Sequence, residues 1–327
     1  MSCPYSQDPS GAPGTGPGTG PGSAHHVEHH AAEDASGQAR TQVHSAEAGI
    51  RDIEATVRTD FSNKMSYGGY LDLERVLHAQ HPHSSPEHHD EMLFIIQHQT
   101  SELWLKLVLH ELTEARRLMD ADDLGKALKC LARVKHIQKI LTDQWSVLAT
   151  LTPREYAQFR GSLGSASGFQ SWQYRAVEFI LGNKHRGMLK VFESHPEAHS
   201  MLGRLLGEPT VYDAFLAALA RAGYAIPDEV LHRDFSEPWT LHEGLIPVFR
   251  EIYESEDTRW MFYQACEDLV DLEDNFQAWR FRHLRTVQRT IGFKRGTGGS
   301  SGVDFLRRAL DLTFFPELYA VRTEIGN

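Results

Sequence analysis

Residues 257–290 read DTRWMFYQACEDLVDLEDNFQAWRFRHLRTVQRT. Apolar side chains return at every third or fourth position along this stretch, which is the spacing of one face of an α-helix. This apolar seam consists of Phe262, Cys266, Leu269, Leu272, Phe276, Trp279, His283 and Val287. The stretch therefore predicts one long helix whose seam contains a histidine near its carboxyl end.

Helical spacing begins at about residue 50 and continues through most of the chain. Asp90 and Pro153 are suited to helix starts, and Gly182 to a helix end. The predicted helices span residues 90–119 and 122–150, a segment that opens at Pro153, and 169–182, with shorter helices in an insertion over 186–245. No alternating strand pattern of useful length occurs. The sequence thus predicts an all-α fold, a bundle of long helices with one small helical insertion.

The amino-terminal segment differs in composition from the rest of the chain. Residues 1–45 are rich in glycine, proline and histidine and carry too few apolar residues to build a core. We expect this segment to be a disordered tail. Residues 46–327 are then expected to form a single all-helical domain that includes the insertion.

The composition excludes several classes of protein. The chain has 327 residues, of which 41% are hydrophobic, and a formal net charge of −11, which disfavours a general nucleic-acid binder. No run of 18 apolar residues is present, so no membrane span is expected, and no secretory signal is visible. Three widely spaced cysteines support neither a disulfide framework nor a cysteine zinc site. A cytoplasmic, reducing setting fits these features.

His283 is the first candidate functional residue, because it lies on an apolar seam beside aromatic side chains. Haem iron is commonly held by one imidazole from a helix, and a seam of leucine, phenylalanine and tryptophan suits a porphyrin face. Nearby arginines could meet the porphyrin's propionates; these are Arg280, Arg282, Arg285 and Arg289. The alternative is a packed core histidine bonded to a neighbouring carbonyl, and the residues alone leave it open.

A glycine-rich basic loop, GFKRGTGGSSG over residues 292–302, follows the long helix. Lys294 precedes the glycines, which excludes a P-loop, and Ser301 stands where a dinucleotide fingerprint needs its third glycine. Glycines let a backbone approach a ligand closely. With Thr297 as a hydroxyl donor, the loop suits a small anionic or zwitterionic ligand.

Three further segments carry candidate binding groups. Phe94 and His98 are four residues apart and so share one helix face. Tyr156 and Arg160 share a face in the same way, and the planar fork of an arginine matches a carboxylate. Small polar residues follow at 165–171. The segment YGGYL, over residues 67–71, places aromatics beside glycines and suggests docking onto another subunit.

Together these segments resemble the tryptophan 2,3-dioxygenase family closely. The resemblance runs from about residue 60 to 318. The motifs that carry it are Ser66-Tyr67-Gly-x-Tyr70-Leu71; His89-Asp90-Glu91-x-Leu93-Phe94-Ile95-x-x-His98-Gln99-x-x-Glu102-Leu103-Trp104-x-Lys106; Phe159-Arg160 with Ala166-Ser167-Gly168-Phe169-Gln170-Ser171; and Arg282-His283 with Arg289-Thr290 and the glycine-rich loop.

The resemblance implies a role for each matching residue. His283 would be the proximal haem ligand and would bind the iron. His98 would face the indole nitrogen as the catalytic histidine, and Phe94 would pack on the indole. The other implied site residues are Tyr156 and Arg160 near the substrate carboxylate, Thr297 at the substrate's ammonium and carboxylate groups, Trp145 and Ser167 near the haem, and Tyr67, Tyr70 and Leu71, which a neighbouring subunit would receive.

The resemblance also implies an activity and an assembly. The expected enzyme is a cytoplasmic homotetramer, a dimer of dimers, with one non-covalent haem b per subunit, ferrous in the active state. It would insert both atoms of O2 across the indole C2–C3 bond of L-tryptophan and release N-formyl-L-kynurenine, the first step of the kynurenine pathway. The alternatives are a relative that oxidises another indole in secondary metabolism and a haem-binding sensor without turnover. Neither a nucleic acid nor a membrane is an expected partner.

Overall fold

A computed structural model of the chain describes residues 53–62, 64–255 and 260–326. The chain divides into two units, residues 1–64 and residues 65–327. The predicted tail over 1–45, and its boundary, lie outside the described residues. Between 53 and 64 the described backbone forms turns and irregular structure rather than a helix, so the helical pattern starts later than expected.

Throughout the described part of the chain, the regular elements are helices and no strand occurs, which confirms the predicted all-α class. None of the described helices is long and apolar enough to cross a membrane. The α-helices are α1 Tyr67–Tyr70, α2 Leu73–Leu77, α3 His89–Asp120, α4 Leu124–Asp143, α5 Trp145–Leu148, α6 Pro153–Phe159, α7 Trp172–Leu181, α8 Pro196–Gly207, α9 Val211–Arg221, α10 Asp228–Leu231, α11 Ile246–Glu254, α12 Trp260–Ile291, α13 Val303–Arg308 and α14 Pro316–Ala320. Short 3-10 helices lie at Arg160–Leu163, Gly168–Gln170, Arg186–Phe192, Glu243–Leu245, Ala309–Asp311 and Val321–Thr323.

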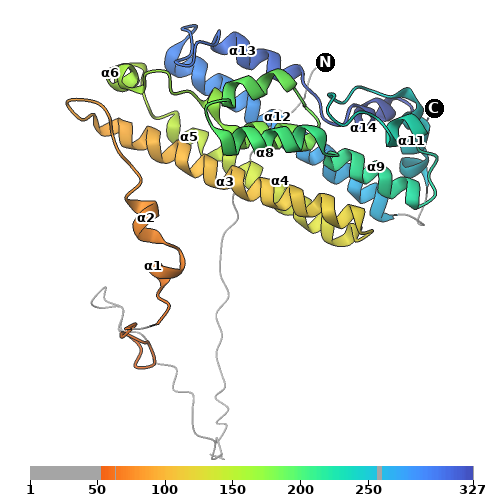
Figure 1. The fold of residues 1–327 in the computed structure, drawn as a ribbon, viewed down its shortest axis with the longest axis horizontal. Helices are drawn as coiled ribbons and strands as arrows, with labels where there is room; N and C mark the ends of the chain where they lie inside the picture. Colours follow the sequence, from red (N-terminus) through yellow and green to blue (C-terminus); the bar gives the residue numbers. More distant parts are fainter. Residues whose placement is uncertain (1–52, 63, 256–259, 327) are drawn as a thin grey trace, which may run out of the picture. The chain divides into compact units, whose positions relative to one another are not determined.

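The long helices α3, α4 and α12 form the framework of the larger unit, with α4 packed against both of the others (Figure 1). The middle of the predicted seam on α12 is fully buried there, at Cys266, Leu269 and Leu272. The start of α3 differs from the prediction, since the helix begins at His89 and Asp90 lies inside its first turn. As a first-turn carboxylate, Asp90 still interacts favourably with the helix dipole.

The helix predicted over 122–150 is divided into α4 and α5. Gln144 separates the two, and its side chain donates to Ser101 Oγ at 2.7 Å, which ties the break to α3. The predicted start at Pro153 is confirmed. Thr152 and Glu155 form a capping box there, in which each side chain bonds the other's backbone N–H. Both α5 and α6 pack against α3 and α12.

The region 186–245 contains short helices, as predicted, and it packs into the larger unit. The apolar face of α9 joins the main core through Phe215 and Leu219, and α9 lies against α3. The apolar face of α8 forms a second cluster with α7, in which Leu202 packs with Phe179.

Two buried carboxylates attach the carboxyl-terminal segment. Glu273 on α12 accepts from the backbone N–H groups of Phe314 and Phe315, at 3.1 and 2.9 Å. Glu317 accepts from the Tyr212 hydroxyl and from the backbone N–H of His242, at 3.0 and 2.7 Å. Burial raises the pKa of both carboxyls, against the opposing effect of these donors. These bonds join the end of the chain to α12 and to α9.

Candidate active site

His98 lies on α3 with its ring direction set by its own helix. Its Nδ1 is 2.7 Å from the Phe94 carbonyl oxygen, and a carbonyl can only accept, so Nδ1 carries the proton. Nε2 is therefore an acceptor. Burial lowers the pKa of His98, so the ring is neutral at pH 7.

His283 lies on α12 between two tryptophans. Its ring stacks on Trp145 at a centroid distance of 4.7 Å and an angle of 10°, and lies 5.4 Å from the ring of Trp279. Burial lowers the pKa of His283 to about 4, and the nearby His98 contributes to the lowering. Among the described residues no hydrogen bond engages the His283 ring. A neutral imidazole in such surroundings has a lone pair free to bind a metal.

Protein atoms surround both imidazoles closely enough to lower their pKa values. Each residue nevertheless keeps some solvent-accessible surface. They come from different long helices and border the same apolar cluster, because His98 contacts Phe94 and His283 stacks on Trp145. The structure thus brings His98 and His283 into one site. The helices that surround this end of the bundle are α5 and α6.

An aromatic cluster forms the wall beside His98. The Phe94 ring lies 4.1 Å from His98, 5.8 Å from Tyr156 and 5.7 Å from Phe159. Phe159 is fully buried and was not predicted as a site residue. Its spacing of three from Tyr156 on α6 was the available signal, because side chains three apart meet on one helix face. Burying a side chain of this size stabilises the wall by about 1.5–3 kcal/mol.

The polar end of the site is made by Arg160 and the glycine-rich loop. Arg160 Nη2 donates to the Arg295 carbonyl at 2.7 Å, while its buried Nε has no partner. The Thr297 hydroxyl donates to the Ala166 carbonyl. Burial raises the pKa of the Tyr156 hydroxyl against the opposing effect of Arg160.

Ser167 and the glycine-rich loop are in close contact. A Cβ at Gly298 would lie 2.7 Å from Ser167 Cβ, closer than side-chain carbons approach. The Ser167 hydroxyl accepts from the Phe169 backbone N–H at 3.4 Å. The structure therefore brings together Arg160, Thr297 and Ser167, which the sequence placed in separate segments.

The structure leaves Tyr67, Tyr70 and Leu71 apart from the two histidines. The exposed fractions of these residues are 77%, 76% and 40%. No hydrogen bond, ion pair or ring contact in the described part of the chain joins them to His98 or His283. Their predicted role in a neighbouring subunit's site stays a prediction.

Comparison with known proteins places the chain in a family. A sequence model described as Tryptophan 2,3-dioxygenase matches residues 52–245 and 239–325. The tryptophan 2,3-dioxygenase of Rhodococcus jostii (strain RHA1) is 65% identical over 280 residues, covering 86% of this chain and 99% of the relative. The chain belongs to the tryptophan 2,3-dioxygenase family.

More distant tryptophan 2,3-dioxygenases match over nearly the same length. The one from Arthrobacter sp. (strain FB24) is 64% identical over 282 residues, covering 86% of this chain and 99% of the relative. The one from Serratia proteamaculans (strain 568) is 55% identical over 276 residues, covering 84% and 99%. All the candidate site residues lie within the region that matches the tryptophan 2,3-dioxygenase family.

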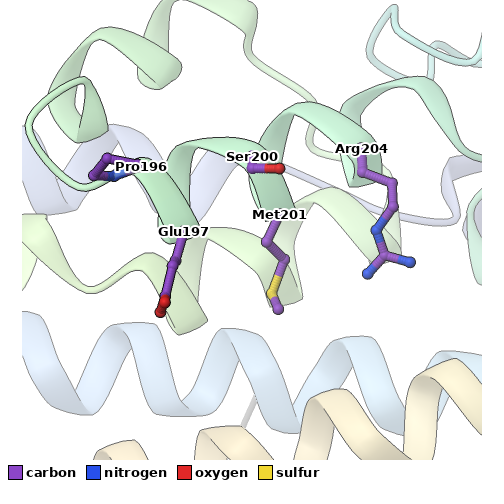
Figure 2. A pocket seen from close by; sticks show the side chains of 5 residues that line it. All are labelled: Pro196, Glu197, Ser200, Met201 and Arg204. Carbon is purple, nitrogen blue, oxygen red and sulfur yellow. The ribbon is translucent and has the colours of Figure 1, made fainter.

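A shallow surface hollow on α8 is separate from this site. Figure 2 shows its lining side chains, which are Pro196, Glu197, Ser200, Met201 and Arg204. None of them is a candidate site residue. The described residues contain no group of three or more histidine, cysteine and carboxylate side chains that could together hold a metal ion. We assign the hollow no function.

Proposed function

We propose that this chain is a haem-dependent tryptophan 2,3-dioxygenase that cleaves the indole C2–C3 bond of L-tryptophan with O2 and releases N-formyl-L-kynurenine. The observation that carries the proposal is that two imidazoles, from α3 and α12, border one apolar cluster through Phe94 and Trp145. His98 offers a fixed acceptor, and His283 offers a ring that no hydrogen bond among the described residues engages.

The residues around His283 fit a non-covalent haem b. A single neutral imidazole from a helix is a common axial ligand of haem iron. The indole Nε1 atoms of Trp145 and Trp279 are buried donors without partners, and such donors suit the anionic edge of a cofactor. Ser167, also expected near the haem, lies at the start of the 3-10 helix Gly168–Gln170 and contacts the glycine-rich loop. Bound ferrous haem would supply the reactivity toward O2 that amino-acid side chains lack.

The other residues would bind and orient the substrate. Phe94 would pack on the indole ring, and His98 Nε2 would accept a hydrogen bond from the indole N–H. We assign His98 to orientation, because an indole N–H is too weak an acid for an imidazole to deprotonate at low cost. Orientation of this kind lowers a barrier by removing the entropy cost of alignment.

The polar end would bind the amino-acid group. Arg160 has an unpartnered Nε–H for a carboxylate oxygen, and Tyr156 lies beside it. Thr297 would contact the ammonium and carboxylate groups. These groups favour an amino acid over a simple indole, and therefore favour tryptophan catabolism over the oxidation of another indole.

The assembly and location are part of the proposal. We propose a cytoplasmic homotetramer in which Tyr67, Tyr70 and Leu71 of one subunit complete the site of a neighbour. Their exposure on the short helix α1 and at the residue that caps it supports this arrangement, because a cluster of exposed apolar side chains marks an interaction surface.

The test mixes the ferrous holoprotein with L-tryptophan under anaerobic conditions and then admits air. A product with the mass of tryptophan plus two oxygen atoms, formed over many turnovers, is expected. A haem protein that binds tryptophan without product would be a sensor, and turnover of indole in preference to tryptophan would indicate the secondary-metabolism alternative.

His283→Ala should lose stable haem incorporation, and an unchanged Soret band with full haem would show that another residue is the ligand.

A further inference from the structure

Arg280 lies on α12 one helical turn before His283, and its guanidinium is inside the protein. The residue is 3% exposed. Nη2 donates to Glu178 Oε1 on α7 at 2.9 Å. Nη1 donates to the Leu312 carbonyl at 3.0 Å, and Nε donates to the Tyr174 hydroxyl at 3.4 Å. Arg280 is therefore engaged by the protein. The sequence-based expectation that it could meet a cofactor's carboxylates is wrong, because its donors are already bonded to protein acceptors.

The rest of the surroundings hold the guanidinium plane in place. It lies over the Phe276 ring at 4.7 Å and the Phe314 ring at 5.3 Å. In the amide orientation that satisfies its neighbours, Asn183 accepts from Arg280 Nη2 at 3.1 Å and donates to the Thr313 carbonyl at 3.0 Å. Partners on several sides thus leave this side chain one orientation.

A line of ring contacts connects this junction to the iron-binding candidate. The Tyr174 ring lies 5.9 Å from Phe276 and 5.3 Å from Trp279. The Trp279 ring lies 5.4 Å from His283. Any movement of Arg280 relative to α7 therefore reaches the His283 ring through two packed aromatic side chains.

The energetics of a buried ion pair favour a geometric role over a stabilising one. Removing two charges from water costs about as much as their attraction returns, and apolar replacements of similar volume are often neutral or stabilising. The side chains of Arg280 and Glu178 are only 2% and 3% exposed, so this cost applies in full. What an apolar pair would lack is the planar fork, which fixes one helix against another at set angles.

We propose that the Glu178–Arg280 ion pair is a positioning device for His283. By fixing the height and rotation of α12 against α7, the pair sets the direction in which the imidazole lone pair points. The inference rests on the proposed function, in which His283 binds the haem iron. The hydrogen bonds of both partners go to protein groups, and both partners act on His283 through Tyr174 and Trp279.

The experiment removes the charges of Arg280 and Glu178 together, and it leaves Arg175 a hydrogen-bond acceptor in place of the carboxylate. In the double variant Arg280→Met with Glu178→Gln, the glutamine oxygen can still accept from Arg175, which bonds Glu178 in the native protein. The readouts are the iron–histidine stretching band of the ferrous holoprotein by resonance Raman and the rate of haem release to excess apomyoglobin. We expect the band to shift or broaden and haem release to accelerate about 10-fold or more. The single variant Arg280→Lys should keep neither the native iron–histidine band nor the native rate of haem release, because one ammonium cannot reproduce the planar fork.

A second buried ion pair provides the matched control. Arg233 donates to both carboxylate oxygens of Asp213 on α9, at 2.7 Å each, and lies over the Trp239 ring at 4.9 Å. The double variant Arg233→Met with Asp213→Asn removes both charges of a similar pair from a region that does not contact His283. We expect an unchanged band and a haem release rate within about twofold of the native protein, since distant sites behave independently.

Each outcome decides between the proposals. If the native holoprotein lacks an iron–histidine band, the proposed ligand is wrong and this inference falls with it. If the band is present but neither band nor release rate changes in Arg280→Met with Glu178→Gln, the pair is merely structural, and the proposed function stands. Equal losses in the control, Arg233→Met with Asp213→Asn, would show a general effect of destabilisation and overturn the inference. Should the variant at positions 280 and 178 not fold, native values in Arg280→Lys would overturn the inference alone.

Discussion

The two imidazoles of the site are neutral for the same reason and useful in different ways. Burial disfavours the charged form of each ring and lowers the pKa of both His98 and His283. The bond from His98 Nδ1 to the Phe94 carbonyl leaves Nε2 as an acceptor, which suits an N–H group of a ligand. His283 has no such bond among the described residues and offers its lone pair to a metal.

At Arg160 the structure supports a specific substitution test. Arg160→Ala should cost about 2–5 kcal/mol in kcat/KM for L-tryptophan, because a charged substrate group loses its partner. Arg160→Lys should rescue poorly, since lysine lacks the fork. Tryptamine, which has no carboxylate, should be nearly indifferent to the change. Steady-state kinetics with both substrates measure this, and equal losses on the two would remove Arg160 from the carboxylate site.

The lowered pKa of His283 predicts how the stability of the haem-free protein depends on pH. The unfolded chain binds a proton at its ordinary pKa near 6.5, but the folded protein does so only near pH 4. Protonation therefore favours unfolding, and stability should be full above pH 6.5 and fall as the pH drops toward 4. The loss is at most about 3 kcal/mol, less any screening at the accessible part of the ring.

Urea unfolding of the haem-free protein and of His283→Gln between pH 7.5 and 4.5 checks this dependence. The variant should lose less stability than the native protein over that interval. His98 contributes in the same direction in both proteins, so the comparison isolates His283. Parallel stability curves would contradict the assignment of a buried, neutral His283.

At the scale of elements, the glycine-rich loop is defined by where it docks. It follows α12 directly and rests on the segment before the 3-10 helix Gly168–Gln170. Two close approaches require glycine. A Cβ at Gly298 would strike Ser167, and Gly302 has a φ of +66° with the Lys294 carbonyl 2.6 Å from the Cβ position. The loop therefore keeps Thr297 near Arg160 only while these positions lack side chains.

Gly298→Ala should displace the loop from Ser167. The cost of forcing a methyl group into a filled space is about 1–3 kcal/mol, which we expect as a raised KM for L-tryptophan with unchanged haem content. Gly168→Ala is the matched control, because a Cβ there meets nothing within 4 Å. Kinetics and haem absorbance measure both variants. An unchanged KM in Gly298→Ala would show that the docked loop does not contribute to substrate binding.

For the whole molecule, contact with a neighbouring subunit is the simplest use of the exposed residues Tyr67, Tyr70 and Leu71. Subunits carrying Tyr67→Ala with Leu71→Ala, mixed with subunits carrying Arg160→Ala, should regenerate some native sites from the intact halves of two chains. Activity after proven subunit exchange is the measurement. Activity that stays at the sum of the two parents would mean that each site is built within one chain.

Removal of residues 1–45 tests the predicted tail. The segment has no means of burying apolar surface, so haem content, assembly and activity should stay within about a factor of two. Size-exclusion chromatography and the oxygen assay measure the truncated protein. Dissociation of the oligomer on truncation would show that the tail folds onto a partner.

Local spacing in the sequence was sufficient for much of the fold and for the choice of residues. The three-to-four spacing identified α12 and its histidine, and Pro153 marked the start of α6. Helix formation and capping depend on residues within a few positions of one another, so such features can be read without a structure. The family motifs likewise singled out His98 and Arg160 before any geometry was known.

Only the tertiary structure decided what those residues meet. The helix predicted over 122–150 is interrupted at Gln144, whose side chain bonds Ser101 on α3, 43 positions away. Arg280, expected to be available to a cofactor, is buried against Glu178, 102 positions away. Thr297 meets Ala166 across 131 positions. Periodicity records which face of a helix is apolar but carries no information about which other element covers that face, because the partner is chosen by packing the whole chain at once.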